Sequence, residues 1–405
     1  MKPPSVQSVI IEPTTHHIII MKKPIHYLGL DVHADSITIA VAEAGREGEV
    51  RLYGKISNHL YTLDKAITKL GHPSTELHVC YEAGPCGFVL ARHFAKKKID
   101  CTVAAPSLIP KGASDRIKTD TRDALALARL HRAGELTAVH VPDARDEAVR
   151  DLCRARTDAV RDRRTCRHQL KAFLLRNGYR YKDGTSWTEK HLHYLRALTF
   201  DHPAMKIVLE EYMLAISAAE NRIERIEIAM EQQLTDWHLA PCVRALMGMR
   251  GFRVIAAMIV VSELGDIHRF AHPRQLMAYL GLVGSESSSG EKTNRGGITK
   301  AGNSHLRWIM NECAQHYRLS PGISVNLSRR QSQIDKPIRK EVCAIAWKAQ
   351  QRLHGKCIAL AARKKMRQKV QISMARELCG FVWAVLKVAT PTAAVPTLTE
   401  TPAKA

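Results

Sequence analysis

The segment Ile25–Asp31, with the sequence IHYLGLD, decides the fold, because it is the first of three consecutive strand-like runs and ends on a carboxylate. The segment from Ser36 to Glu43 alternates between polar and apolar residues, and a glycine-containing turn at residues 44–48 separates it from Val50 to Ile56. Short runs of this kind between turn signals predict strands. Three of them in succession predict a β-meander.

Beyond this meander, helical and strand-like segments alternate. Leu60 to Leu70 has helical spacing, and the strand-like run from Leu77 to Tyr81 ends at Glu82. A second helical segment, residues 87–97, and a fifth strand, residues 100–104, precede the next helix. This order of elements predicts an α/β domain with the ribonuclease H-like fold. The fold class by itself leaves the function open.

Four acidic residues stand where these predicted elements end or begin. They are Asp31 and Glu82, at the ends of the first and fourth strands, and Asp120 and Asp123, at the start of a later helix. In this topology the first and fourth strands are neighbours, so the four side chains are expected to converge. Carboxylates held close together repel one another unless Mg²⁺ or Mn²⁺ lies between them. The pattern therefore predicts a metal site suited to phosphoryl transfer.

The stretch KTDTRDA, residues 118–124, adds detail to this site. Asp120 and Asp123 are spaced i, i+3 and share one helix face, and the flanking Lys118 and Arg122 suit a site that also meets phosphate. Taken alone, the two aspartates favour an ordinary helix start, where Asp caps free N–H groups. The acids upstream shift the interpretation to a metal site. We interpret His33 as an ordinary surface histidine rather than as a metal ligand or substrate contact.

Charge and cysteine usage narrow the class of protein. The 405 residues contain 61 Lys and Arg against 39 Asp and Glu, a formal charge of +22 that favours a nucleic-acid partner. No apolar run approaches the roughly 20 residues of a membrane span, so no membrane partner is expected. The ten cysteines occur singly, without a CxxC pair, which argues against a zinc ribbon and fits a cytoplasmic protein with reduced thiols.

Residues 145–238 predict a basic, helical, coiled-coil region. From Arg145 to Lys171, arginines outnumber acids and alternate with apolar positions, which favours a nucleic-acid contact over a merely solvated helix face. From Ile207 to Leu234, apolar residues recur at helical spacing between Glu and Arg, which favours a helical hairpin used for oligomerisation.

The following region predicts a mainly helical domain. A glycine-rich turn at Leu246–Phe252 precedes an apolar run, as in a helix–hairpin–helix element. Residues 281–290 are rich in Ser and Gly and are by default a flexible connection. Three cations follow that are suited to neutralising a phosphate beside a serine hydroxyl, namely Arg295, Lys300 and Arg307. The residue pattern does not choose among the candidate nucleophiles Ser285, Ser287, Ser288 and Ser289.

We accordingly divide the chain into an N-terminal extension, an acidic α/β domain, a basic helical region, a C-terminal domain and a disordered tail. The corresponding ranges are 1–24, 25–144, 145–238, 239–388 and 389–405.

Several short motifs occur in an order that resembles the DEDD transposases of the IS110 family, including its IS1111 branch. The resemblance spans residues 25–320 and is carried by GLD at 29–31, YEAG at 81–84, KTDTRDA at 118–124, GLV at 281–283 with SSG at 288–290, and TKAGN at 299–303 with LR at 306–307.

The resemblance implies a RuvC-like N-terminal domain that holds metal through Asp31, Glu82, Asp120 and Asp123, a coiled-coil middle and a C-terminal transposase domain. It also implies that Ser289 is a nucleophile that forms a phosphoserine link to DNA. A structured bridge RNA that pairs with donor and target DNA would guide the enzyme. Dimers would assemble into a tetramer, in which the serine of one protomer approaches the acidic site of another.

The chain departs from this pattern at Gly284, where relatives often carry proline, and in having three consecutive serines at 287–289. The second departure leaves the choice of nucleophile open by one or two positions. Two other functions stay open beside the transposase. One is a Holliday-junction nuclease of the RuvC type that uses water, and the other is a nucleic-acid-binding protein without catalytic activity.

Overall fold

A computed structural model describes residues 24–71, 76–110, 119–289 and 293–390. The chain forms two compact units, which divide between Val141 and Pro142. Most of the predicted extension and tail, together with Lys118 and Gly290, lie outside the described residues. Each unit is described below by itself.

The first unit is built on a five-stranded sheet with the order β3-β2-β1-β4-β5. The first three strands form an antiparallel meander. Strand β4 pairs in parallel with β1, and β5 pairs in parallel with β4. This arrangement confirms the predicted strands and the mixed α/β class. The strands are β1 Ile25–Val32, β2 Ser36–Glu43, β3 Val50–Ser57, β4 Glu76–Glu82 and β5 Asp100–Ala104.

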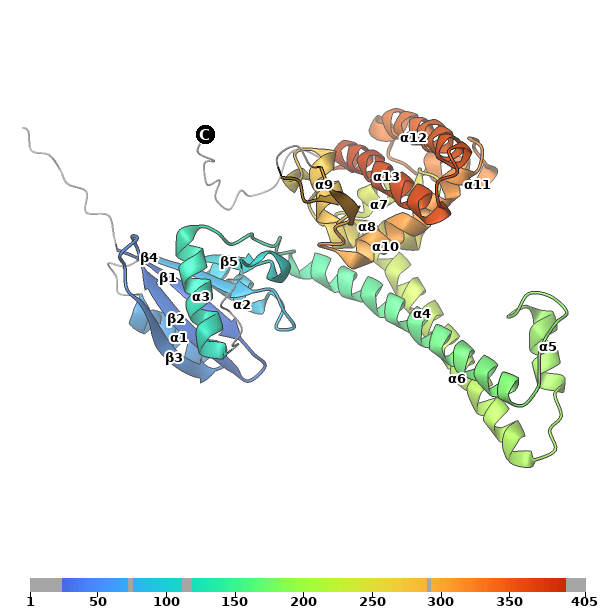
Figure 1. Ribbon diagram of the computed structural model, residues 1–405, viewed down its shortest axis with the longest axis horizontal. Helices are drawn as coiled ribbons and strands as arrows, with labels where there is room; N and C mark the ends of the chain where they lie inside the picture. Colours follow the sequence, from blue (N-terminus) through green and yellow to red (C-terminus); the bar gives the residue numbers. More distant parts are fainter. Residues whose placement is uncertain (1–23, 72–75, 111–118, 290–292, 391–405) are drawn as a thin grey trace, which may run out of the picture. The chain divides into compact units, whose positions relative to one another are not determined.

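Helices cover both faces of this sheet. The first two, α1 (Leu60–Leu70) and α2 (Val89–Lys96), pack on the face that carries Leu28 and Leu30. The third, α3 (Asp120–Ala133), lies over the opposite face against β1 and β2 (Figure 1). A single 3₁₀ turn, Pro106–Leu108, follows β5. The sheet is therefore the middle layer of a three-layer unit.

Gly29 sets how closely α3 approaches the sheet. A Cβ atom at this position would lie 2.3 Å from the carbonyl oxygen of Ala124 and 2.4 Å from the amide nitrogen of Ala128. Because side chains alternate along a strand, Gly29 and Asp31 are on the same face of β1. The close approach brings the first turn of α3 beside the end of β1.

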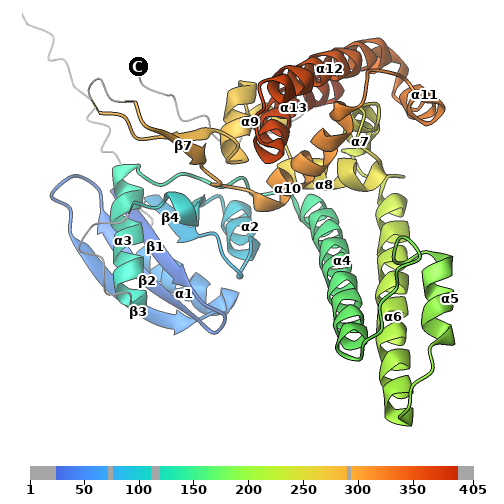
Figure 2. The same cartoon turned by 45° about the vertical axis from the view of Figure 1, so that its right-hand side comes forward.

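The second unit begins with two long helices, α4 (Ala144–Arg176) and α6 (Pro203–Gln233), which pack side by side. A shorter helix, α5 (Glu189–Ala197), lies in the connection at their far end (Figure 2). Ion pairs join the long helices, with Arg156 Nη2 2.6 Å from Glu227 Oε1 and Arg222 Nη1 2.9 Å from Asp162 Oδ2. The structure thus places a helical hairpin where the sequence predicts one.

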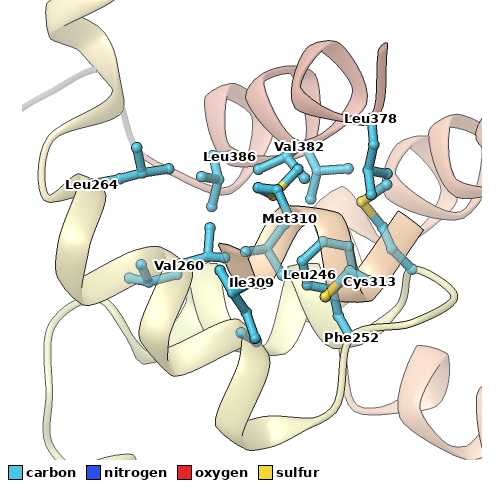
Figure 3. Close-up of a cluster of buried hydrophobic side chains, with 14 of the residues drawn as sticks. Leu246, Phe252, Val260, Leu264, Ile309, Met310, Cys313, Leu378, Val382 and Leu386 are labelled. Atoms are coloured by element: carbon cyan, nitrogen blue, oxygen red, sulfur yellow. The ribbon is translucent and has the colours of Figure 1, made fainter. Parts of the chain in front are cut away.

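The rest of this unit is a helical bundle around a large apolar core. Val260, Met310 and Val382, from three different helices, meet in this core (Figure 3). The helices are α7 Ala240–Met247, α8 Val254–Leu264, α9 Pro273–Tyr279, α10 Ser304–Ala314, α11 Val325–Ser332, α12 Lys336–Ala362 and α13 Arg367–Ala389, with 3₁₀ turns at Ile267–Arg269 and Gln315–Arg318. No helix in the described ranges is long and apolar enough to cross a membrane.

One expectation for this unit is wrong. Residues 281–290 do not form an unstructured connection throughout, because Gly284–Glu286 (β6) pairs antiparallel with Arg295–Ile298 (β7). The Ser- and Gly-rich composition conceals two short strands whose side chains are mostly exposed, so no apolar alternation marks them in the sequence.

Candidate active site

The sheet register places polar side chains in a row across one level of the first unit. Asp31 is opposite Thr38, and Thr38 is opposite Lys55 on the next strand. On the other side, Leu30 pairs with Tyr81, so the following residues, Asp31 and Glu82, end neighbouring parallel strands. The row therefore brings Lys55 and two of the four predicted carboxylates, Asp31 and Glu82, to the same end of the sheet.

Helix α3 brings Asp120 to this row. Thr119 caps the helix by accepting a hydrogen bond from the amide of Arg122, which fixes where the helix starts. Asp120 accepts a hydrogen bond of 3.0 Å from Lys55 Nζ. His33 Nε2 lies 3.1 Å from Asp31 Oδ2 and 3.6 Å from Asp120 Oδ1. Asp123 is one turn further along the helix and close enough to raise the pKa of Asp31.

The electrostatic environment differs between the two aspartates. Burial raises the pKa of Asp31, and the nearby charges of Asp120 and Asp123 raise it further, against the lowering effect of His33. The hydrogen bond from Lys55 lowers the pKa of Asp120. A charge that is unfavourable at Asp31 in this environment would be stabilised by a cation bound between the carboxylates.

The residues present fit a divalent cation. One ligand atom each from Asp31, His33 and Asp120 lies within 4.8 Å of the other two. Carboxylate oxygens suit Mg²⁺ and Mn²⁺, and an imidazole nitrogen suits Mn²⁺ better. Within the described part of the chain, the buried hydroxyl of Thr38 has no hydrogen-bond partner. Thr38 pairs with Asp31 in the sheet, so this hydroxyl stands on the strand beside the carboxylates.

Two residues of this cluster were missed or misjudged from the sequence. His33 is exposed, as predicted, but it also contacts two of the predicted carboxylates, which the sequence does not reveal. Lys55 was not singled out, although the pairing of three meander strands places it two strands from Asp31 on the same row. Glu82 is exposed at the end of β4. Of the four predicted acids, the structure brings Asp31 and Asp120 closest, with Asp123 beside them.

The predicted serines lie on the β6–β7 hairpin of the second unit. The hydroxyl of Ser285 donates to the carbonyl of Gly297 at 3.1 Å, and the hydroxyl of Ser288 donates to Glu286 at 2.9 Å. Ser287 and Ser289 are exposed, and neither side chain hydrogen-bonds to a residue in the described ranges. These two serines are therefore the better placed for attack on an external phosphate.

The cations predicted near the serines have different environments. Arg295 is exposed, and its Nε lies 3.5 Å from Glu286 Oε2 across the hairpin. Lys300 is exposed, with a φ of 55°. Arg307 donates hydrogen bonds of 2.8 Å and 3.1 Å to the carbonyls of Leu280 and Ala301. Arg295 and Lys300 are thus better placed than Arg307 to meet a phosphate.

The base of the hairpin is fixed by backbone contacts between two of the quoted motifs. The amide of Lys300 donates to the carbonyl of Gly281, and the amide of Thr299 donates to the carbonyl of Val283. A Cβ atom at Gly302 would lie 2.0 Å from the carbonyl oxygen of Tyr279, so this packing requires glycine. The hairpin therefore projects from a rigid base.

Glu263 of α8 ties this base to α4. Its carboxylate accepts two hydrogen bonds from Arg154, at 2.7 and 3.0 Å, and one of 2.8 Å from Asn303. His305 Nδ1 lies 3.1 Å away. Burial alone would raise the pKa of Glu263, but these hydrogen bonds outweigh it and lower the pKa to about 2. Asn303 also caps α10 through its side-chain oxygen, so the contacts of this carboxylate hold α4, the hairpin base and α10 together.

Two family models match the chain. The model DEDD_Tnp_IS110, described as a transposase, matches residues 28–177, which include Asp31, Glu82, Asp120 and Asp123. The model of the transposase IS116/IS110/IS902 family matches residues 243–320, which include the hairpin and α10.

Known transposases are similar over most of their length. The putative transposase y4qE of Sinorhizobium fredii is 44% identical over 90% of each chain. The transposase for insertion sequence element IS1533 of Leptospira borgpetersenii is 30% identical over 85% of this chain and 99% of its own. The transposase for IS1111A of Coxiella burnetii is 25% identical over 76% and 84%. The chain therefore belongs to the IS110 family of DEDD transposases and is a DNA transposase of an insertion sequence.

Proposed function

We propose that this transposase cuts and rejoins DNA through a phosphoserine intermediate, with a divalent cation at the acidic site of its first unit. The observation that carries the proposal is the convergence of Asp31 and Asp120, from the end of β1 and the start of α3. Transposition requires phosphoryl transfer, and clustered carboxylates are the ligands that such chemistry uses to hold Mg²⁺ or Mn²⁺.

In this proposal Asp31, Glu82, Asp120 and Asp123 hold the cation, and His33 is a further ligand or positions Asp31 through their contact of 3.1 Å. The bound cation supplies charge neutralisation for the oxygens of the scissile phosphate. Lys55 and Arg122 add positive charge beside the acids, at positions suited to DNA phosphates. Lys118 has the same proposed role, although it lies outside the described residues.

Ser289 is the proposed nucleophile. Its Oγ forms a bond to phosphorus and gives up its proton, while the bond from phosphorus to the 3′ oxygen breaks and that oxygen takes up a proton. The products are a 5′ phosphate linked to the protein and a free 3′ hydroxyl, and the reverse reaction rejoins strands. Arg295 and Lys300 stabilise the charge on the phosphate, with Arg307 holding the hairpin base.

The proposed partners are donor DNA, target DNA and a structured bridge RNA, with dimers that assemble into a tetramer. The formal charge of +22 supports several polyanionic partners. The long α4–α6 hairpin supports a role in assembly, because exposed apolar residues such as Ile207, Leu214 and Ile228 lie on α6.

A denaturing gel tests this function. Full-length protein is incubated with labelled element-junction DNA, Mg²⁺ and RNA from the element's non-coding end. We expect a protein-linked DNA band with the wild type, none with Ser289→Ala or Asp120→Ala, and none without RNA. Ser287→Ala is the matched control, since it removes the other exposed hydroxyl without a hydrogen-bond partner among the described residues, and it should retain the band.

Other outcomes would overturn parts of the proposal. A band that survives Ser289→Ala but is lost in Ser287→Ala would move the nucleophile by two positions. Cleavage without any linked band, unaffected by both serine variants, would mean a nuclease that uses water. A band that forms equally well without RNA would remove the guide from the proposal.

A further inference from the structure

One face of α4 carries a continuous basic stripe. Arg154, Arg161, Arg164 and Lys171, together with Thr157 and His168, follow one another at spacings of three and four residues and so share one side of the helix. From Arg154 to Lys171 the stripe is about 25 Å long, at 1.5 Å per residue. It is long enough to follow several consecutive phosphates of a nucleic-acid strand.

The arginines of α4 divide into those with carboxylate partners and those without. Arg156 and Arg167 pair with Glu227 and Glu220 of α6 and belong to the helical hairpin. Two cations of the stripe are paired as well, Arg154 with Glu263 and Arg161 with Asp158. By contrast, Arg163, Arg164 and Lys171 form no ion pair with a carboxylate in the described part of the chain. Three cations close together on one helix therefore lack an anionic partner among the described residues of this unit.

A cleft of about 780 Å³ lies at one end of the stripe, between α4 and the start of α10. Trp308 lines it and is 42% exposed. The indole stacks on the ring of His305, with an angle of 8° between the planes. His305 is itself held by contacts of 3.1 Å to Thr157 and to Glu263. An exposed aromatic ring is thus held in a fixed orientation beside the arginines.

A second cleft of about 330 Å³ lies at the other end of the stripe. Its lining includes Arg163, Arg164, Lys171 and Trp187, and no carboxylate. The guanidinium of Arg167 lies 4.6 Å from the centre of the Trp187 ring. Arg164 lines both clefts, so they lie next to each other along the helix.

We infer that this face binds an unpaired stretch of nucleic acid, with bases stacked at Trp308 and Trp187 and phosphates at Arg163, Arg164 and Lys171. An aromatic ring can stack only on a base whose face is open, whereas the bases of a duplex already stack on one another. Basic side chains between aromatic rings are the arrangement expected for single strands. The inference rests on the proposed function only in taking nucleic acid as the partner.

The ligand could be an unpaired loop of the guide RNA or a DNA strand freed during exchange, and both offer the same chemistry. Binding is measured with full-length protein by fluorescence anisotropy, using labelled 20-nucleotide oligouridine, the matching oligothymidine and a 20-base-pair duplex. A preference for oligouridine assigns the face to RNA. Equal affinity for both single strands assigns it to any unpaired strand.

The variants separate stacking from charge. We expect Trp308→Ala to weaken single-strand binding about tenfold, with little change for the duplex, and Trp308→Phe to restore most of the loss. The double variant Arg163→Ala/Arg164→Ala should lower the slope of log K against log salt concentration by about 1.4, or 0.7 per phosphate contact. Arg196→Ala/Arg225→Ala removes two exposed charges from α5 and α6 and is the matched control.

Two results would overturn the inference. One is unchanged single-strand affinity in both Trp308→Ala and the Arg163/Arg164 double variant. The other is an equal loss in the Arg196/Arg225 control, which would mean that only total charge matters. If either occurs while the serine-dependent DNA adduct still forms, this inference fails and the proposed function stands.

Discussion

Asp31 and Glu263 are both carboxylates that burial disfavours in the charged form, yet their pKa values shift in opposite directions. Glu263 is 1% exposed and has three hydrogen-bond donors and His305 around it, so its pKa falls to about 2. Asp31 is 18% exposed, and in the described part of the chain its one hydrogen-bonding partner is His33. Its other near neighbours include Asp120 and Asp123, and its pKa rises.

The difference separates a structural carboxylate, Glu263, from one that we propose as a metal ligand, Asp31. Glu263 is fully satisfied within the protein and therefore contributes stability. Asp31 is held among other acids, a position that costs stability until a cation arrives. The same physical rule, that a buried charge needs partners, thus explains the structural role of Glu263 and supports the proposed ligand role of Asp31.

The largest loss of stability is expected when Glu263, the structural carboxylate, is removed. Glu263→Ala leaves Arg154 without its partner and removes the contact that joins Asn303 to α8, so the second unit should lose about 3 kcal/mol of stability. All five tryptophans lie in the second unit, so urea unfolding followed by tryptophan fluorescence reports on this unit. Asp162→Ala, which removes an exposed ion pair with Arg222, should cost less than about 1 kcal/mol. Equal losses in the two variants would contradict the structural role.

Acidification should affect the two carboxylates in opposite ways. The pKa of Glu263 is lower in the folded than in the unfolded protein, so its contribution, on the order of 3 kcal/mol, is present above pH 4.5 and is lost as the pH falls toward 2. The raised pKa of Asp31 has the reverse sign, since protonation relieves an unfavourable charge. Tryptophan fluorescence should therefore report acid unfolding of the second unit, and Glu263→Gln should flatten its pH dependence. An unchanged profile in Glu263→Gln would refute this assignment.

A smaller loss of stability is expected when the packing of α3, which positions Asp120, is disturbed. Gly29→Ala places a Cβ atom against the backbone of α3, so the helix must move away from β1 at a cost of about 1–3 kcal/mol. Because α3 carries Asp120, DNA adduct formation should fall more than the loss of stability explains. Ala128→Gly, on the facing side of α3, is a control that weakens the helix without a clash. If both variants retain full activity, close packing of α3 is not needed at the site.

The smallest effect on stability is expected at Asp31. Asp31→Asn removes the charge that burial and the neighbouring aspartates disfavour, so hydrogen exchange of the first unit should show a gain, or a change below about 0.5 kcal/mol. DNA adduct formation should nevertheless be lost. A clear destabilisation in Asp31→Asn would mean that its carboxylate is structural, like that of Glu263, and the comparison would fail.

Most strands and helices can be predicted from the sequence, because hydrophobic periodicity and the signals that end an element are local. The five strands, the helix at Asp120 and the long helices α4 and α6 are placed correctly from such patterns. His33 and Lys55 could not be placed in the same way, since their roles arise from strand register and from the packing of α3 on the sheet. Glu263 lies within the apolar helix α8, where a single acid gives no sign of its distant partners Arg154 and Asn303.

The central claim is that the acids of the first unit form a metal site. Mn²⁺ binding to the full-length protein loaded with junction DNA, followed by electron paramagnetic resonance, tests it most directly. We predict that Asp120→Asn abolishes specific binding. Asp64→Asn, the same change at a half-buried acid paired with His93 and Lys97 in the same unit, should leave binding intact. Specific Mn²⁺ binding that persists in Asp120→Asn at wild-type affinity would contradict the claim.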